Sequence, residues 1–190
     1  MHSNFTVIFD ACVLYPAPLR DLLMRLALTD LFRAKWTNQI HEEWIVNLLE
    51  NRADLTREQL ERTRDLMNSH LRDSLVEDYE DLIDSIELPD KDDRHVVAAA
   101  IKSGSSYIIT YNLKDFPSAT LDKYNISAQH PDEFIINQID LNVAKVCEAL
   151  AGQRSSLRKP PCSPDELLET LLKAGLTSSV NQLKHWRQAF

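Results

Sequence analysis

Glycine is scarce in this sequence, whose 190 residues include only Gly104, Gly152 and Gly175. Neither a GxGxxG fingerprint nor a GxxxxGKS or GxxxxGKT loop can be written with them. Nucleotide binding through a glycine-rich phosphate loop is therefore excluded.

Cysteine pairs and long apolar runs are also lacking. The three cysteines, Cys12, Cys147 and Cys162, form no CxxC pair and no Cys/His cluster with the spacing of a zinc site. No stretch approaches the roughly 20 uncharged apolar residues of a membrane-spanning helix. The sequence does not begin with a basic segment followed by an apolar run. We expect a cytoplasmic protein with reduced thiols and no membrane partner.

Positive charge is in deficit, and the formal net charge is −8. Residues 1–130 hold 22 Asp and Glu against 14 Lys and Arg, whereas residues 131–190 hold seven of each, so the acidic excess lies in the first part. A protein that binds nucleic acid chiefly by neutralising phosphates is usually basic. Composition thus argues against a non-specific nucleic-acid binder, but not against an enzyme whose metal ions face the phosphate.

Short apolar runs alternate with helical patterns over the first 130 residues. We expect strands at 5–10, 32–36, 86–88, 107–110 and 126–128, helices at 19–31, 37–49, 52–72 and 93–103, and a proline-stiffened loop at 11–18. Strands that alternate with helices imply parallel, right-handed crossovers. We therefore predict an α/β fold over residues 1–130, a three-layer α/β/α sandwich with a central parallel sheet.

No strand pattern occurs from about residue 131 onward. Helical patterns cover 132–151, 165–174 and 178–189, with a Ser/Arg/Pro linker at 152–164. We predict an all-helical C-terminal extension over residues 131–190. The last two helices could form a helix-turn-helix DNA reader, but helical hairpins that only pack are far commoner.

Acidic residues follow or face the ends of several predicted strands. Asp10 ends the first strand, Asp93 begins a helix, and Asp115 lies in the loop after 107–110. Each has an ordinary structural explanation: Asp is frequent in turns and at helix N-caps. Glu42 and Glu43 both flank the apolar side of their helix, so periodicity does not choose between them. Because ligands bind at the carboxyl edge of open α/β sheets, we expect these acids to converge there.

Carboxylate oxygens without His or Cys favour Mg²⁺ or Mn²⁺. Such an ion would neutralise the clustered acids, activate water and stabilise in-line displacement at a phosphodiester. His41 and His95 neighbour the acids in sequence, and we expect them to pack or to support the acids. Arginines alternate with acids over 52–72, which is typical of a solvated helix with ion pairs. Alternatively, one face of that helix offers arginines to RNA phosphates.

Four segments together resemble the PIN domain, in particular the VapC-type ribonuclease toxins of bacterial toxin–antitoxin pairs. They are Val7-Ile8-Phe9-Asp10-Ala11-Cys12-Val13-Leu14, Ile40-His41-Glu42-Glu43-Trp44, Asp92-Asp93-Arg94-His95-Val96-Val97-Ala98-Ala99-Ala100 and Ile109-Thr110-Tyr111-Asn112-Leu113-Lys114-Asp115-Phe116. The resemblance covers about residues 5–130. It implies a metal-dependent endoribonuclease that cleaves single-stranded RNA and is blocked by a cognate antitoxin protein, and it leaves room for a homodimer.

The resemblance also implies roles for individual residues. Asp10, Glu43, Asp93 and Asp115 would be the catalytic acids and metal ligands, and Asn112 and Thr110 would orient water or substrate. The choice of Glu43 over Glu42 comes from the family pattern alone. The family often has Thr-Asn after its first Asp. This chain has Ala11-Cys12 instead, which removes a hydroxyl and an amide near the site.

Two other functions compete with the nuclease. A phosphatase of the haloacid-dehalogenase type would use Asp10 as nucleophile, but that chemistry wants a second acid at position 12, where Cys12 stands. A catalytically silent PIN-like module would use its acids only to bind a basic partner.

Overall fold

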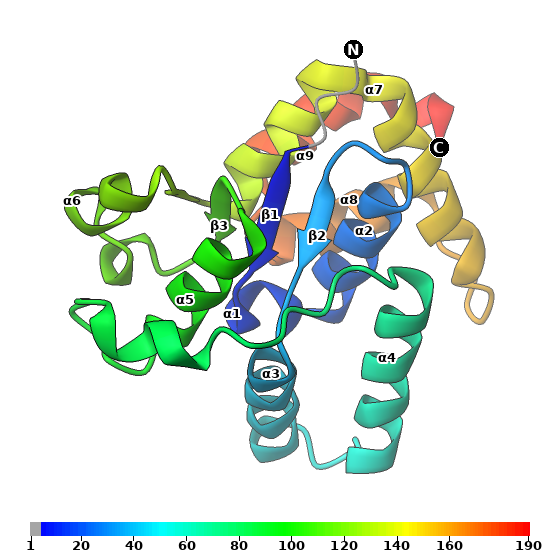
Figure 1. Cartoon of the computed structure of the whole chain (residues 1–190). Coiled ribbons are helices and arrows are strands. Elements are labelled where there is room, and N and C mark those ends of the chain that lie inside the picture. The colour runs from blue at the N-terminus through cyan, green and yellow to red at the C-terminus, as the bar shows by residue number, and fades with distance from the viewer. Residues whose placement is uncertain (1–4) are drawn as a thin grey trace.

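A four-stranded parallel sheet lies at the centre of the computed structural model, which describes residues 5–190. The strand order is β2-β1-β3-β4, and each neighbouring pair is parallel (Figure 1). The strands are β1 (Thr6–Phe9), β2 (Arg33–Lys35), β3 (Tyr107–Ile109) and β4 (Ser127–Gln129). The predicted α/β fold with a parallel sheet is confirmed.

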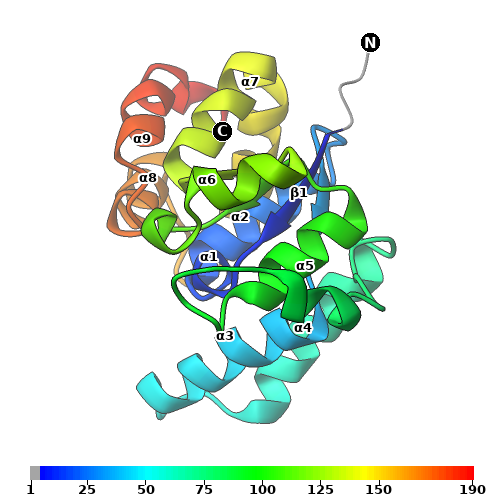
Figure 2. The ribbon, with the colours of Figure 1, turned by 60° about the vertical axis from the view of Figure 1, so that its left-hand side comes forward.

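Helices cover both faces of this sheet. α5 lies on one face, while α2 and α7 pack against each other on the opposite face (Figures 1 and 2). The helices are α1 (Ala11–Leu14), α2 (Ala17–Ala27), α3 (Asn38–Asn51), α4 (Arg57–His70), α5 (Arg94–Ser103), α6 (Ser118–Leu121), α7 (Pro131–Ser156), α8 (Pro164–Lys173) and α9 (Thr177–Leu183). Short 3₁₀ turns are η1 (Glu80–Ser85), η2 (Leu113–Asp115), η3 (Asp122–Tyr124) and η4 (Lys184–Ala189).

The central strands end side by side. Val7, Ile8 and Phe9 of β1 are fully buried, because helices cover both faces of the strand. Phe9 pairs in register with Ile109 of β3, and the Asp10 N–H donates to the Ile109 carbonyl at 3.1 Å. The residues that follow β1 and β3 therefore meet at one edge of the sheet.

Helix starts differ in a way that matters for the site. The N-cap residues of α3, α4 and α8 are Thr37, Thr56 and Ser163, and each side chain accepts a backbone N–H of its helix. Asp10 and Asp93 occupy the same N-cap position before α1 and α5, yet within residues 5–190 neither makes a side-chain capping bond. Their carboxylates are left available for other contacts.

Two sequence-based predictions of local structure are wrong. Residues 86–88 form no strand: Ile86 and Leu88 are buried and Glu87 is exposed, but none of the four strands of the described chain pairs with them. This extended segment follows η1, which packs on α5. Its alternating residues are therefore buried as in a strand although it joins no sheet. The loop expected at 11–18 contains α1 and the first turn of α2, where Pro18 stands in the first helical turn, a position that tolerates proline.

The C-terminal region is helical, as predicted. α7 begins directly after β4 and carries Phe134 into the same core as Phe9 and Phe32, with ring centroids 6.2 Å and 4.9 Å away. One hydrophobic cluster runs from β1 through α9. The apolar sides of α8 and α9 are buried in that cluster, so these two helices pack as a hairpin. α7 extends to Ser156, into the predicted linker, and has non-helical backbone at Asn142.

None of the helices within residues 5–190 combines the length and the apolar character that crossing a membrane requires.

Candidate active site

A cleft of about 680 Å³ opens at the carboxyl edge of the sheet. It is bordered by α1, α3, the segment before α5 and the loop after β3. Its lining includes Asp10, Glu43, Asp93 and Asn112, together with Asp92. Three of the four predicted acids thus meet in one cavity although the chain separates them by up to 83 positions (93 − 10).

Asp10 is held by hydrogen bonds at one oxygen. Its side chain is buried, and Thr110 Oγ1 donates to Oδ2 at 2.7 Å. Cys12 Sγ donates to the same oxygen at 3.1 Å. Because both bonds converge on Oδ2, the carboxylate is oriented while Oδ1 keeps its lone pairs for another ligand. Thr110 is fully buried behind Asp10 and outside the cleft lining, so its hydroxyl orients the Asp10 carboxylate.

Cys12 supplies polar contacts of its own where the sequence has Ala11-Cys12 in place of Thr-Asn. Its sulfur accepts the Tyr111 backbone N–H at 3.3 Å and donates to Asp10, so it joins the loop after β3 to the first acid. Burial first, and then the charge of Asp10, raises the pKa of the Cys12 thiol to about 12. The thiol stays protonated near neutral pH, which excludes a cysteine nucleophile at this position.

Asp93 carries the clearest electrostatic signature. Burial, followed by the charges of Asp10, Asp90 and Asp115, raises its pKa from 3.8 to about 6. The ionised form of this carboxylate is destabilised, because the side chain is partly buried and negative charges surround it. Asp93 also lacks the capping bond that would explain an aspartate at this helix start.

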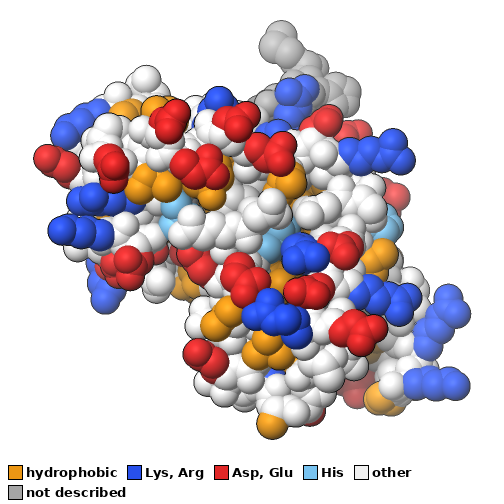
Figure 3. Space-filling model, turned by 60° about the horizontal axis from the view of Figure 1, so that its bottom comes forward, with side chains coloured by type: hydrophobic (Ala, Val, Ile, Leu, Met, Phe, Trp, Pro, Cys, Tyr) orange, Lys and Arg blue, Asp and Glu red, His pale blue; other side chains and the backbone are white. Residues whose placement is uncertain are grey.

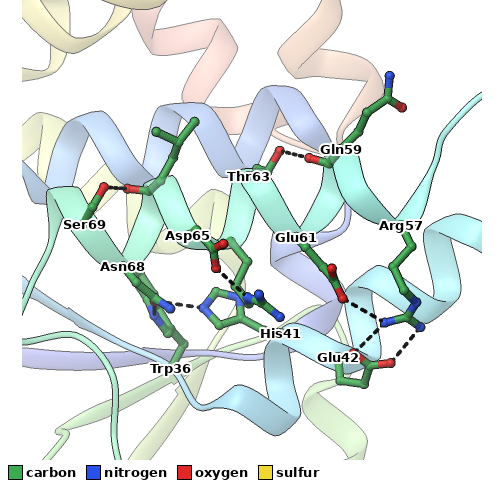
Figure 4. Close-up of polar contacts among 12 residues, drawn as sticks. Trp36, His41, Glu42, Arg57, Gln59, Glu61, Thr63, Asp65, Asn68 and Ser69 are labelled. Carbon is green, nitrogen blue, oxygen red and sulfur yellow. Dashed lines mark hydrogen bonds and ion pairs between the residues drawn. The ribbon is translucent and has the colours of Figure 1, made fainter.

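The two neighbouring glutamates of α3 have different surroundings. Glu43 Oε1 lies 2.8 Å from Nε2 of the buried His95, a close polar contact that joins α3 to α5. Glu42 instead forms a bidentate pair with Arg57 of α4 at 2.9 and 3.1 Å, outside the cleft lining (Figure 4). Tertiary structure thus separates two residues that helical periodicity leaves equivalent.

His41 serves packing, as expected. Trp44 Nε1 donates to its Nδ1 at 3.0 Å, so Nε2 carries the proton and donates to Asn68 Oδ1 at 3.2 Å (Figure 4). Desolvation lowers the pKa of His41 to about 4, which keeps the ring neutral. Its partners belong to α3 and α4, so His41 joins these helices and takes no part in the cleft.

Asp115 stands apart from the other acids. It lies in η2 and is absent from the cleft lining, although its charge contributes to the raised pKa of Asp93. Asn112 does line the cleft, and its backbone N–H donates to Thr110 Oγ1 at 3.0 Å. The structure therefore brings Asp10, Glu43, Asp93 and Asn112 together, with Thr110 behind Asp10 and Asp115 at a longer range.

The carboxylates that line the cleft are of the kind that bind a hard cation such as Mg²⁺, but few of them could contact one ion directly. Within residues 5–190, no three Asp, Glu, His or Cys side chains are grouped so that they could hold one metal ion. Mg²⁺ commonly keeps several waters and takes only one or two carboxylates. Such an ion would suit Asp10, whose two hydrogen bonds both use Oδ2, and Asp93, around which acidic neighbours outweigh the positive influence of His95.

Basic side chains are missing from the cleft. Among the described residues that line it there is no Lys or Arg. On the surrounding face, Lys and Arg are interspersed with Asp and Glu (Figure 3). On α4, Arg57 pairs with Glu42 and Glu61, and Arg64 pairs with Asp65. This favours the solvated, ion-paired interpretation of that helix.

Two features of the site escaped sequence reasoning. Gln39, Asn47 and Asn51 line the cleft; their four-residue spacing from Glu43 was the signal that could have identified them. The other feature is a contact from the C-terminal region: Tyr111 Oη donates to the Ala174 carbonyl at 2.5 Å. No pattern in the sequence announces that contact.

Comparison with known proteins places the chain. The family model described as "PIN domain" matches residues 6–114, more than half of the chain. The chain belongs to the PIN-domain family. A second model, described as "VapC50 C-terminal domain", matches residues 131–185 of this PIN protein, over the helices α7 to α9.

One curated relative matches strongly. It is the protein named "Putative ribonuclease VapC50" of Mycobacterium tuberculosis, which is 40% identical over 93 residues, covering 49% of this chain and 54% of the relative. The match therefore spans about half the length of that relative. No solved structure gives a significant match to the chain.

Proposed function

We propose that this PIN protein is an endoribonuclease that hydrolyses phosphodiester bonds of single-stranded RNA with the help of Mg²⁺ or Mn²⁺. The observation that carries the proposal is the meeting of Asp10, Glu43 and Asp93 in one cleft. Two of these acids sit at helix starts without the capping bonds that would account for them. The family match and the name of the relative agree with this activity.

Asp10 and Asp93 would hold the cation, partly through water, and Glu43 and Asp115 would add negative charge that attracts it. When bound, the ion supplies Lewis-acid stabilisation of the phosphate and lowers the pKa of water. Thr110 and Cys12 fix the Asp10 carboxylate, and His95 fixes Glu43. Asn112 at the rim of the cleft would orient water or the scissile phosphate.

The direct test compares two substitutions that preserve shape. Asp10→Asn and Asp93→Asn should each abolish cleavage of a fluorogenic single-stranded RNA in Mn²⁺ or Mg²⁺, and EDTA should abolish wild-type cleavage. Exposed Asp84→Asn is the matched control and should cleave normally. Retention of activity in both Asp10→Asn and Asp93→Asn would refute the assignment.

A silent binding module is the second candidate, favoured by the absence of a preassembled three-residue metal group in residues 5–190. Calorimetric titration with Mn²⁺ separates the two. The nuclease should bind Mn²⁺ in a manner that Asp10→Asn weakens. No binding, or binding that Asp10→Asn leaves unchanged, would favour the silent module. Rapid turnover of a small phosphomonoester without RNA cleavage would instead indicate the phosphatase.

We further propose that the nuclease is the toxin of a type II toxin–antitoxin pair. The C-terminal match and the VapC relative support this role. An antitoxin would block the acidic cleft by inserting Arg or Lys, which carboxylates bind through charge-assisted hydrogen bonds. Expression of the chain should arrest growth, and co-expression of the neighbouring open reading frame should restore it. Unimpaired growth at confirmed expression would refute the toxin role.

A further inference from the structure

Three amide side chains extend the cleft along α3 on either side of Glu43. Gln39, Asn47 and Asn51 stand at four-residue intervals with Glu43, which places all four on one face of the helix. We call Gln39, Asn47 and Asn51 the amide stripe. All three are exposed, and from Gln39 to Asn51 the helix rises about 18 Å. The stripe is long enough to lie along several successive nucleotides of an extended strand.

The charge of the cleft decides what such a stripe can recognise. The lining contains four carboxylates and, among the described residues, no Lys or Arg. Phosphates that enter the cleft must therefore be neutralised by bound cations. The amide stripe carries no charge and offers only neutral hydrogen bonds. Each amide presents a carbonyl acceptor and an NH₂ donor. Base edges also present donors and acceptors, whereas phosphates present acceptors only, so an amide is better matched to bases.

The individual amides are placed for this role. Asn51 Nδ2 donates to the Asn47 backbone carbonyl at 2.7 Å, which anchors the side chain at the last turn of α3. Gln39 Nε2 reaches Glu43 Oε1 only at 3.5 Å, a weak contact that a ligand can replace. Tyr15, which follows α1, is half-buried and lines the same cleft. Aromatic rings of this kind stack on unpaired bases.

We propose that the amide stripe and Tyr15 form a base-reading wall, which selects the unpaired nucleotides that flank the scissile phosphate. The ligand is single-stranded RNA, because in an A-form duplex the Watson–Crick edges are paired and the major-groove edges lie in a deep, narrow groove that side chains cannot read. The inference rests on the proposed ribonuclease activity and deepens it: the acids would catalyse cleavage, and the base-reading wall would determine which phosphodiester bond is cleaved.

The test is cleavage-site sequencing on a random single-stranded RNA pool in Mn²⁺. Wild type should show base preferences next to the cut. Asn47→Ala/Asn51→Ala should flatten the preference at one or more positions and lower kcat/KM about five- to tenfold, mainly through KM, as expected for lost hydrogen bonds. Tyr15→Leu should raise KM, and Tyr15→Phe should restore it. Asn38→Ala is the matched control: Asn38 is an exposed amide of α3 outside the cleft lining.

The outcomes separate this inference from the activity beneath it. If wild type cleaves RNA but shows no base preference, or if Asn47→Ala/Asn51→Ala leaves both the preference and KM within twofold of wild type, the wall is refuted while the nuclease stands. If the amides contact phosphates instead of bases, Asn47→Ala/Asn51→Ala should lower kcat/KM equally for all sequences. That result would also refute the base-reading wall. If wild type neither cleaves RNA nor binds it in a fluorescence-anisotropy titration, both proposals fall.

Discussion

Asp93→Asn should make the metal-free protein more stable while it removes activity. In the folded chain the pKa of Asp93 rises from 3.8 to about 6, chiefly through burial and then through Asp10, Asp90 and Asp115. The folded state thus binds this proton more tightly than the unfolded state. The associated stability is complete below about pH 4 and is lost as pH rises to about 6. Near pH 7.5 the ionised carboxylate is a net cost that Asn does not carry.

The size of the effect follows from the same shift. A rise from 3.8 to about 6 corresponds to at most about 3 kcal/mol. Because Asp93 is only half-buried, solvent screening reduces this to about 1–2 kcal/mol. For a chain of this length, that raises Tm by about 2–8 °C. Asn is as good an N-cap residue as Asp, so the start of α5 should not be weakened.

Urea and thermal unfolding in EDTA at pH 4, 5, 6 and 7.5 measure the difference between Asp93→Asn and wild type. The gain should be largest at pH 7.5 and close to zero at pH 4. Asp84→Asn should show no such pH-dependent gain. Adding Mn²⁺ should stabilise wild type, by the linkage between ligand binding and folding, more than it stabilises Asp93→Asn. No gain at pH 7.5, or a gain equal at all four pH values, would refute the electrostatic reasoning.

Four further predictions concern neighbouring contacts. Glu43→Gln should lower RNA cleavage at least about tenfold. Glu42→Gln should keep cleavage within about twofold of wild type, because the exposed Glu42–Arg57 pair lies outside the cleft. Equal losses in the two variants would contradict this prediction. Iodoacetamide at pH 8 should leave Cys12 of the folded protein unmodified in mass spectra, because its pKa is about 12; rapid labelling would contradict that. Tyr111→Phe removes the hydrogen bond to Ala174 and should lower the free energy of unfolding, measured in urea, by about 1 kcal/mol. Asp132→Ala removes the carboxylate that accepts the Ser178 and Ser179 N–H groups at 2.8 Å, and should cost about 2 kcal/mol in the same assay.

The Tyr111–Ala174 hydrogen bond connects the C-terminal helices with the loop after β3, and the Asp132 contacts join two of those helices to each other. Asp132 lies in the first turn of α7 and accepts N–H groups from the start of α9, while the Ala174 carbonyl in the turn before α9 accepts the Tyr111 hydroxyl. Tyr111 also packs edge-on against His130, with ring centroids 5.1 Å apart. Residues 131–190 therefore contact the loop after β3 at Tyr111, between Thr110 and Asn112. The division of the chain at residue 130 stays a prediction, and the two parts share one hydrophobic core.

Local sequence determined the elements whose signals are short-range. The apolar run of β1 ends at Asp10 because a buried strand excludes a charge until its edge. Gly104 ends α5 in a left-handed conformation, which glycine adopts without strain. The alternation of helix and strand was sufficient for the parallel α/β fold, since right-handed crossovers leave few other arrangements.

Tertiary structure decided everything that depends on which surfaces meet. Glu42 and Glu43 are equivalent along α3 and differ only because Arg57 and His95 approach from α4 and α5. Residues 86–88 have the alternation of a strand, but strand formation needs a partner, and no strand of residues 5–190 pairs with them. The amide stripe became part of the cleft because α3 lies along it, and Asp115 fell outside the lining. Periodicity tells which residues share a face of an element; only packing tells what that face meets.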